Sequence, residues 1–380
     1  MFIVIPQHAA LAKSRRECQN PHNSVPKSTG AAAKAEMNNN KSNPVLVEVT
    51  RGEGVESYHR GAIAIVNAAG DIVQSWGEIA APVLPRSAIK SMLALAIIET
   101  GAADHFNVSD AELAIACASH SAEPEQLDLI EKWLARLSLS GADLECGAMG
   151  SIEEVVNADL IRNQVELTRV HNNCSGKHTG FLTTACHMDE PTNGYIKADH
   201  PAQKRLVVIL EEMGDIDLSA APRGCDGCGI PIIAMPLDAM ARGFAKMASP
   251  DKLSSERAAA ARRITKAIRE NPYMVAGHRR FDSLVIEATS SGPKGAALVK
   301  TGAEGVYAAI LPGLGLGVAL KIDDGARRAS EVAMAAVLGN LGVLNEDAKV
   351  DLENLIQPTV LNAAGDPVGV IRAAASLTGK

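Results

Sequence analysis

The run Arg86-Ser87-Ala88-Ile89-Lys90 places a serine three residues before a lysine. On a helix, side chains at this spacing share one face. A neutral lysine amine beside the hydroxyl can take its proton, and a serine needs such a base because its hydroxyl is a weak nucleophile alone. An apolar stretch over 92–98 follows, so the pattern predicts a helix over 87–100. Spacing alone leaves open that Ser87 is only a helix N-cap.

The Ser-x-x-Lys pattern occurs three more times, at Ser24–Lys27, Ser249–Lys252 and Ser291–Lys294. The bare pattern therefore has little weight, and the apolar surroundings distinguish Ser87 from the others. Ser-x-x-Lys is the first signature of the serine β-lactamases and penicillin-binding proteins. A Lys-Thr-Gly run, Lys300–Gly302, resembles their third signature.

A second group of residues could bind a metal. Cys174, Lys177 and His178 lie in one short segment, and Cys225-Asp226-Gly227-Cys228 follows about fifty residues later. Thiols, a carboxylate and an imidazole suffice for a tetrahedral zinc site. The spacing is not that of a structural zinc finger, and incidental buried thiols remain an equal alternative.

Two further segments carry polar groups that could take part in chemistry. Cys117-Ala118-Ser119-His120-Ser121 ends an apolar helical run and could supply a second hydroxyl and a proton-relay imidazole, or simply a polar helix end. A charged cluster could recognise a charged small molecule, or be a solvated loop. Its members are Arg51, Glu56, His59 and Arg60.

Composition limits the classes of function. The chain has 380 residues, of which 47% are hydrophobic, and a net charge of −7. It has no basic stripe of the kind that binds nucleic acid, and no apolar run of the length that spans a membrane. Seven scattered cysteines do not form a disulfide framework. We therefore expect a cytoplasmic enzyme that neither binds nucleic acid nor enters a membrane.

The hydrophobic periods predict strands near both ends of the chain and helices between them. A hairpin is expected over 62–76 and a three-stranded meander over 296–322, followed by a helix over 328–341. The helices expected between them cover 87–100, 110–118, 123–138, 177–188, 201–213, 230–247 and 252–269. This order indicates an α/β (α+β) fold in which both chain ends form one antiparallel sheet beside an inserted helical region. Residues 1–44 are expected to be a disordered extension, and residues 45–380 a single catalytic domain.

Together the motifs carry a resemblance that none carries alone. Val49–Gly52, Arg86–Lys90, Cys117–Ser121, Asn173–His178 and Asp226–Cys228 occur in one order. In that order and spacing they closely resemble the rhizobial-type (class 3) L-asparaginases of the asparaginase II family. The resemblance runs from about residue 45 to near the C-terminus and leaves out only the N-terminal extension.

The resemblance implies a fold similar to that of the serine β-lactamases and penicillin-binding proteins, hydrolysis of L-asparagine to L-aspartate and ammonia, and a homodimer. It implies Ser87 as the nucleophile paired with Lys90, and a second serine, Ser119, paired with Lys300. It also implies a zinc site near the substrate pocket, held by Cys174, Lys177 and Cys228. The residues expected to bind substrate are Arg51, Arg86, His120 and Asp226.

Two alternatives to this function remain open. One is a β-lactamase-like hydrolase that acts on another amide; the absence of a Ser-Asp-Asn signature and of an export signal counts against it. The other is a non-catalytic zinc-binding protein with the same fold.

Overall fold

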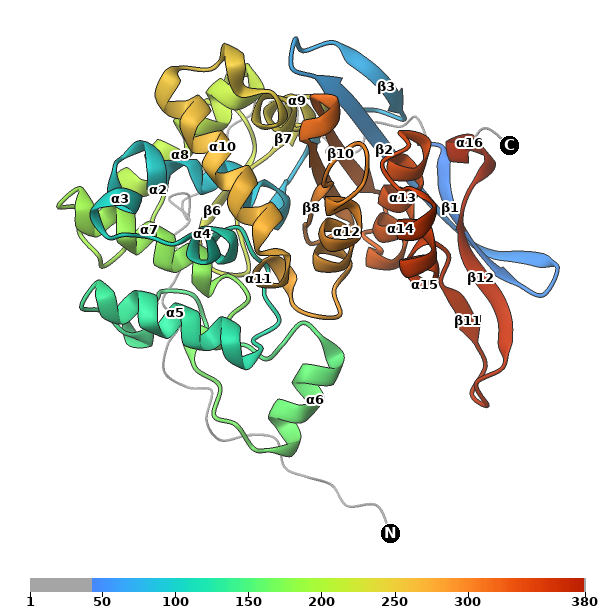
Figure 1. Cartoon of the computed structure of the whole chain (residues 1–380), viewed down its shortest axis with the longest axis horizontal. Helices are drawn as coiled ribbons and strands as arrows, with labels where there is room; N and C mark the ends of the chain where they lie inside the picture. The colour runs from blue at the N-terminus through green and yellow to red at the C-terminus, as the bar shows by residue number, and fades with distance from the viewer. Residues whose placement is uncertain (1–42, 379–380) are drawn as a thin grey trace, which may run out of the picture. The chain divides into compact units, whose positions relative to one another are not determined.

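The computed structural model describes residues 43–378. The predicted disordered extension over 1–44 lies, apart from its last two residues, outside this range. Both ends of the described chain enter one antiparallel sheet, as predicted: β1 (Val45–Arg51) pairs on one side with β2 (Gly54–Asn67) and on the other with β12 (Pro367–Ala373). The late meander continues the sheet from β2 (Figure 1).

The strand order is β11-β12-β1-β2-β10-β9-β8, with β3 beside β2. The remaining bounds are β3 Ile72–Trp76, β8 Leu298–Thr301, β9 Val306–Leu311, β10 Leu316–Ile322 and β11 Thr359–Leu361. Every residue of β8 and β9 is buried, which fits their nearly continuous apolar sequence. β8 is therefore a rigid support for the side chains that it carries.

Two helices cover the sheet on opposite faces. α9 (Leu237–Ala248) packs on β2, β9 and β10, whereas α13 (Arg327–Asn340) packs on β1, β9, β10 and β12 (Figure 1). The helix predicted over 328–341 is thereby confirmed within one residue at each end. Three short helices complete the C-terminal part: α14 (Glu346–Asp351), α15 (Glu353–Ile356) and α16 (Ala375–Thr378).

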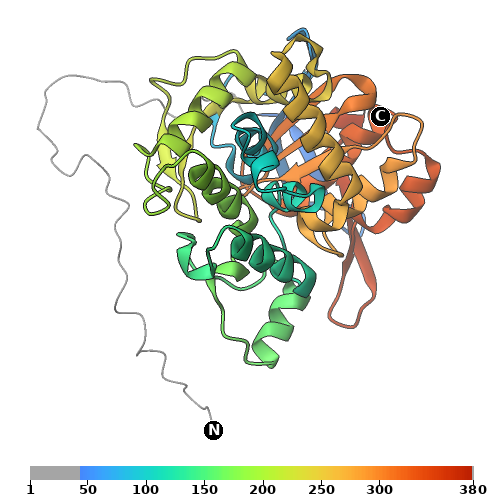
Figure 2. The same ribbon diagram turned by 60° about the vertical axis from the view of Figure 1, so that its left-hand side comes forward.

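The helical region lies between β3 and β8 in the sequence, and the views of Figures 1 and 2 show it gathered beside the sheet. The helix predicted over 87–100 is divided into a 3-10 turn, η1 (Arg86–Ile89), and the short helices α1 (Lys90–Leu93) and α2 (Leu95–Glu99). The other helices are α3 Ala102–His105, α4 Asp110–Ala116, α5 Pro124–Arg136, α6 Glu154–Arg162, α7 Ser175–His187, α8 Pro201–Gly214, α10 Ser255–Glu270, α11 Pro272–Ala276 and α12 Phe281–Ser290.

The helix predicted over 230–247 is wrong in its first third. That stretch forms β6 (Pro231–Ile233), which pairs with β5 (Arg223–Cys225), and then β7 (Met235–Pro236), which pairs with β4 (Pro82–Val83). A short apolar run fits a strand as well as a helix, and the prolines at 231 and 236 favour the extended form. None of the helices in the described part of the chain is both long and apolar enough to cross a membrane.

The close packing of α9 on the sheet gives a first prediction. A Cβ at Gly317 of β10 would lie 2.1 Å from the Ala241 carbonyl oxygen and 2.3 Å from the Ala245 nitrogen of α9. Gly317→Ala should therefore lower the free energy of unfolding by about 1–3 kcal/mol in urea denaturation. The matched control is Gly339→Ala in α13, where a Cβ meets nothing within 4 Å. It should be neutral or stabilising by up to about 1 kcal/mol, and equal losses in both variants would contradict this account of α9.

Candidate active site

The first site segment is the 3-10 turn η1, where the strand-like approach from β4 ends. Arg86 has a left-handed backbone with φ of 51°, an uncommon conformation for a residue with a side chain and one that often marks functional sites. Ser87 follows it and is half-buried. In a 3-10 turn, residues three apart lie over one another, so Ser87 and Lys90 share one side. Gly302 makes room for the turn: a Cβ there would lie 3.0 Å from the Pro85 carbonyl oxygen.

The centre of the site is the buried hydroxyl of Ser119, which lies between two lysine amines. Lys90 Nζ is 3.3 Å from Ser119 Oγ and also donates to the Ala118 carbonyl. Lys300 Nζ is 3.0 Å from the same Ser119 Oγ and 2.8 Å from the Thr301 carbonyl. All three side chains are buried. The structure thus brings Ser119 and Lys300 together, and it directs Lys90 toward Ser119.

Burial has a clear consequence for Lys300. It lowers the pKa of Lys300 to about 7, a shift that Asp282 opposes and Lys90 and Arg280 reinforce. A substantial fraction of Lys300 is therefore a neutral amine near pH 7, with a lone pair that can accept a proton.

The predicted metal ligands also converge. Lys177 Nζ is 2.9 Å from Cys228 Sγ, and a hydrogen bond from the Cys174 thiol is the largest of the effects that lower the pKa of Cys228 to about 5. Burial alone would lower the pKa of Lys177, but Cys174, Cys228 and Asp226 together raise it. Without a metal this corner therefore holds an ammonium–thiolate pair.

The donor set at this corner can be tested against zinc. No three His, Cys, Asp or Glu side chains within residues 43–378 converge as a metal site. The sulfur atoms of Cys174 and Cys228 nevertheless lie close together, and if both bound a metal, the neighbouring Lys177 amine would be the third protein ligand. Thiolate sulfur is a favoured zinc ligand, and the low pKa of Cys228 supplies it at neutral pH. The residues thus fit zinc if Lys177 binds as a neutral amine.

Arg86 and Asp226 form the polar rim next to this corner. Arg86 Nε is 2.6 Å from Asp226 Oδ1, and the Gly227 N–H donates to the same oxygen at 2.9 Å. Although burial opposes ionisation, Lys177 and Arg86 hold the pKa of Asp226 below its usual range. Asp226 is thus a fixed carboxylate 3.6 Å from Cys228 Sγ.

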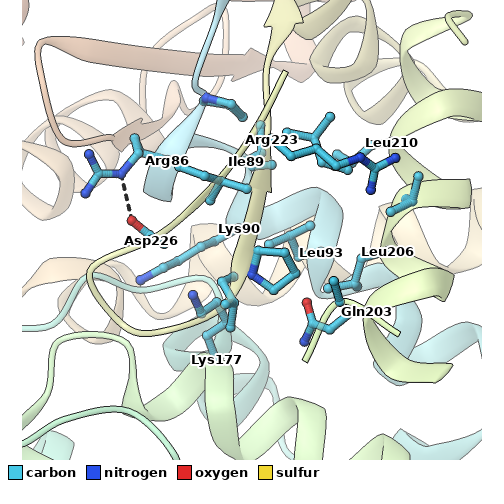
Figure 3. A pocket seen from close by; sticks show the side chains of 17 residues that line it. Arg86, Ile89, Lys90, Leu93, Lys177, Gln203, Leu206, Leu210, Arg223 and Asp226 are labelled. Carbon is cyan, nitrogen blue, oxygen red and sulfur yellow. Dashed lines mark hydrogen bonds and ion pairs between the residues drawn. The ribbon is translucent and has the colours of Figure 1, made fainter. Parts of the chain in front are cut away.

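A small cavity, partly open to solvent, lies beside these groups. Lys90, Lys177, Arg86 and Asp226 line one part of it, and Figure 3 shows both lysines extending toward the same corner near Asp226. The other part is apolar, and Leu93, Leu206 and Leu210 contribute to it. Such a cavity can orient a small polar molecule by its charged end.

A close approach of two helices aligns the segments that carry Ser119 and Lys177. A Cβ at Gly176 of α7 would lie 2.4 Å from the Ile115 carbonyl oxygen of α4. The Ser119 N–H donates to the Val275 carbonyl at 3.1 Å, and the His120 N–H to the Asn173 carbonyl at 3.2 Å. Backbone contacts therefore fix the loop after α4 independently of its side chains.

The buried imidazole of His120 is neutral and engaged with the protein. Burial, reinforced by Lys90, lowers the pKa of His120 to about 3; its Nε2 is 2.8 Å from Ser175 Oγ, and its Nδ1 accepts from the Ala122 N–H. Because the Ser175 hydroxyl donates to the Val170 carbonyl, His120 Nε2 carries the proton. Both ring nitrogens of His120 are thus used within the protein.

Of the predicted site residues, Arg86, Lys90, Lys177 and Asp226 line the cavity, whereas Ser87, Ser119, His120, Cys174, Cys228 and Lys300 are not among its lining residues. Arg51 lies at the exposed tip of the β1–β2 hairpin, where its Nε is 3.0 Å from Glu56, and it does not line the cavity. Cys225 is exposed on β5. Sequence reasoning missed Cys146, a buried thiol in the electrostatic range of Cys174 and Cys228, and Asp282 beside Lys300. Neither belongs to a motif, and only the folded chain brings them near the site.

Comparison with known proteins gives one family. The family model for L-asparaginase II matches residues 47–373. No curated protein matches the chain.

Three solved structures are similar to this chain. A D-alanine carboxypeptidase from Burkholderia cenocepacia is 15% identical, with 74% of this chain and 93% of that one covered and a TM-score of 0.38. A putative β-lactamase from Bacteroides dorei is 12% identical, with 69% of this chain and 84% of that one covered and a TM-score of 0.36. A β-lactamase from Mycobacterium bovis is 14% identical, with 74% of this chain and 94% of that one covered and a TM-score of 0.34. Likenesses of this size carry no argument about activity. The family match is stronger, because it extends from β1 to β12 and includes every segment of the site. This chain belongs to the L-asparaginase II family.

Proposed function

We propose that this chain hydrolyses the side-chain amide of L-asparagine to L-aspartate and ammonia. Membership of the L-asparaginase II family supports an asparaginase-type amidohydrolase. The observation that carries the proposal is the Ser119 hydroxyl between the buried amines of Lys90 and Lys300. A hydroxyl in this position can pass a proton from one amine to the other.

The exposure of the two serines supports separate roles for them. Ser87 is half-buried in η1 and directly follows the cavity-lining Arg86, whereas Ser119 is 3% exposed, and this difference in exposure favours Ser87 as the serine that meets the substrate. In the proposed reaction Ser87 Oγ attacks the amide carbon, and its proton passes to the amines of the Lys90–Ser119–Lys300 group. The ammonia leaves with a proton from the same group, and water then hydrolyses the aspartyl ester. Arg86 and Asp226 offer charges of both signs for the α-carboxylate and α-ammonium groups of the substrate.

We also propose that Cys174, Lys177 and Cys228 hold zinc. When bound, the ion would add positive charge beside the cavity and fix the position of the substrate. A homodimer and a cytoplasmic location complete the proposal; they rest on the family resemblance and on the cysteine usage.

The first prediction about the proposed activity concerns the two serines. Ser87→Ala should lower kcat at least about a thousandfold, because no nucleophile remains, and Ser119→Ala about a hundredfold, because the proton relay is lost. The measurement is ammonia release from L-asparagine, with L-glutamine and a penicillin-type amide in parallel. Ser291→Ala is the matched control, since Ser291–Lys294 has the same spacing in an exposed position.

Wild-type-like turnover in folded Ser87→Ala protein would contradict the assignment of the nucleophile. Turnover of the penicillin-type amide alone would instead favour a β-lactamase-like hydrolase.

The second prediction concerns pH. The Lys300 amine must be neutral to accept a proton, and its pKa lies at about 7. The protonated, inactive form dominates below that value, so kcat/KM should rise with pH and reach half its maximum at about pH 7. Lys300→Arg should remove most of the activity, because arginine stays charged. The exposed Lys294→Arg should leave the profile unchanged, and a profile that falls as pH rises through 7 would contradict a basic role.

The third prediction concerns zinc. Protein purified with zinc supplied and then dialysed should contain about one zinc per chain by elemental analysis. Cys228→Ala should lose it, because one of the two sulfur ligands is removed. Cys225→Ala tests the neighbouring exposed thiol and should keep the metal. Zinc retained in Cys228→Ala but lost in Cys225→Ala would overturn the ligand set.

A further inference from the structure

A buried carboxylate stands beside Lys300 on the side away from the sequence motifs. Asp282 lies in the first turn of α12 and is 1% exposed. Its Oδ2 is 3.7 Å from Lys300 Nζ and makes no hydrogen bond with the described residues. Burying a carboxylate oxygen without a hydrogen bond is unfavourable, and the charge of the nearby Lys300 amine offsets part of that cost.

The other oxygen of Asp282 anchors the carboxylate. Asp282 Oδ1 accepts from the Thr301 N–H at 3.1 Å and from the Tyr307 hydroxyl. Burial, and then Asp282 itself, raise the pKa of Tyr307, so its hydroxyl keeps its proton and remains a donor. Because Thr301 is the neighbour of Lys300 on β8, the anchor ties the carboxylate to the strand that carries the amine.

Asp282 is the carboxylate whose charge acts most strongly on Lys300. The groups whose charges act on Lys300 are Asp282, Lys90, Arg280 and Cys174, and the buried Cys117 thiol is also in range. Arg280 adds buried positive charge, with its Nε and Nη1 unpartnered. The charge of Asp282 thus raises the pKa of Lys300, whereas the positive charges of Lys90 and Arg280 lower it.

We propose that Asp282 is a positioning residue: anchored by Thr301 and Tyr307, its carboxylate holds the Lys300 amine against Ser119 and sets how readily that amine gains and loses a proton. This inference rests on the proposed Ser–Lys function and adds a residue to it that lies outside every motif. The charge of Asp282 stabilises the ammonium form of Lys300, so the amine can hold the transferred proton until the leaving group takes it.

The test is Asp282→Asn, which keeps the side-chain shape and an oxygen that accepts from Thr301 and Tyr307. Loss of the negative charge favours the neutral amine, so the rising limb of kcat/KM should move to lower pH by about one unit or more. On the alkaline plateau kcat should fall about ten- to a hundredfold with little change in KM. The exposed Glu287→Gln on the same helix is the matched control and should change neither.

A measurement that needs no turnover separates this inference from the proposed function. In protein labelled with [ε-13C]lysine, the Lys300 signal is the one missing from Lys300→Met, and its titration midpoint should be lower in Asp282→Asn than in wild type. A lowered midpoint in a protein that releases no ammonia would retain the role of Asp282 and refute the proposed function. An unmoved midpoint in active protein would refute the role of Asp282 alone.

A second variant serves if Asp282→Asn does not fold, as judged by thermal unfolding. Tyr307→Phe keeps the charge of Asp282 and removes one of its anchors. Its kcat should fall, but the rising part of its kcat/KM–pH profile should not move to lower pH, because the carboxylate still faces the Lys300 amine. Unchanged kcat in Tyr307→Phe would overturn the positioning role.

Discussion

Buried positive charge around the Ser119 hydroxyl is the constraint on which the rest of this site depends. Lys90 and Lys300 reach the same oxygen from two sides, at 3.3 and 3.0 Å. Two ammonium ions repel each other strongly in so small and dry a volume, so one amine is favoured to be neutral. Burial favours this state for Lys300. The base that the chemistry needs is therefore a consequence of packing.

Two further cations near the cavity each have an anion. Lys177 pairs with Cys228, and Arg86 pairs with Asp226. These pairs lie at one corner of a cavity that is otherwise largely apolar, where charges are poorly screened and their positions matter. The site therefore offers a polar molecule fixed charges of both signs close in sequence to the half-buried Ser87.

The fold makes this concentration of charge possible by bringing distant segments close at the backbone. β8 carries Lys300 and belongs to a sheet that both chain ends complete, while η1, α4 and α7 carry the other groups. Gly302 and Gly176 lie where β8 meets η1 and where α7 meets α4, and a Cβ at either position would meet a carbonyl oxygen at 3.0 Å or less. Close backbone approach is thus part of the site.

Much of this could be predicted from the sequence, because local pattern and motif order carry it. The two-ended sheet follows from strand periods at both ends, and α4, α7, α8 and α13 lie within about two residues of their predicted bounds. The apolar run at 230–236 did not distinguish strand from helix.

Other features of the site could not be predicted, because they depend on tertiary structure that no motif encodes. The hairpin position of Arg51 and the proximity of Asp282 to Lys300 arise from folding alone. The direction of the Lys90 side chain is a further example, since spacing pairs it with Ser87 whereas packing places its amine on Ser119.

The most direct test of the central claim is to trap the covalent intermediate. The enzyme is mixed with L-asparagine, quenched in acid within one turnover and digested, and the peptides are weighed by mass spectrometry. The account predicts an aspartyl ester on the peptide that contains Ser87, with Ser119 unmodified. An ester on the Ser119 peptide would show that the buried hydroxyl is the nucleophile and would contradict the division of roles argued from exposure.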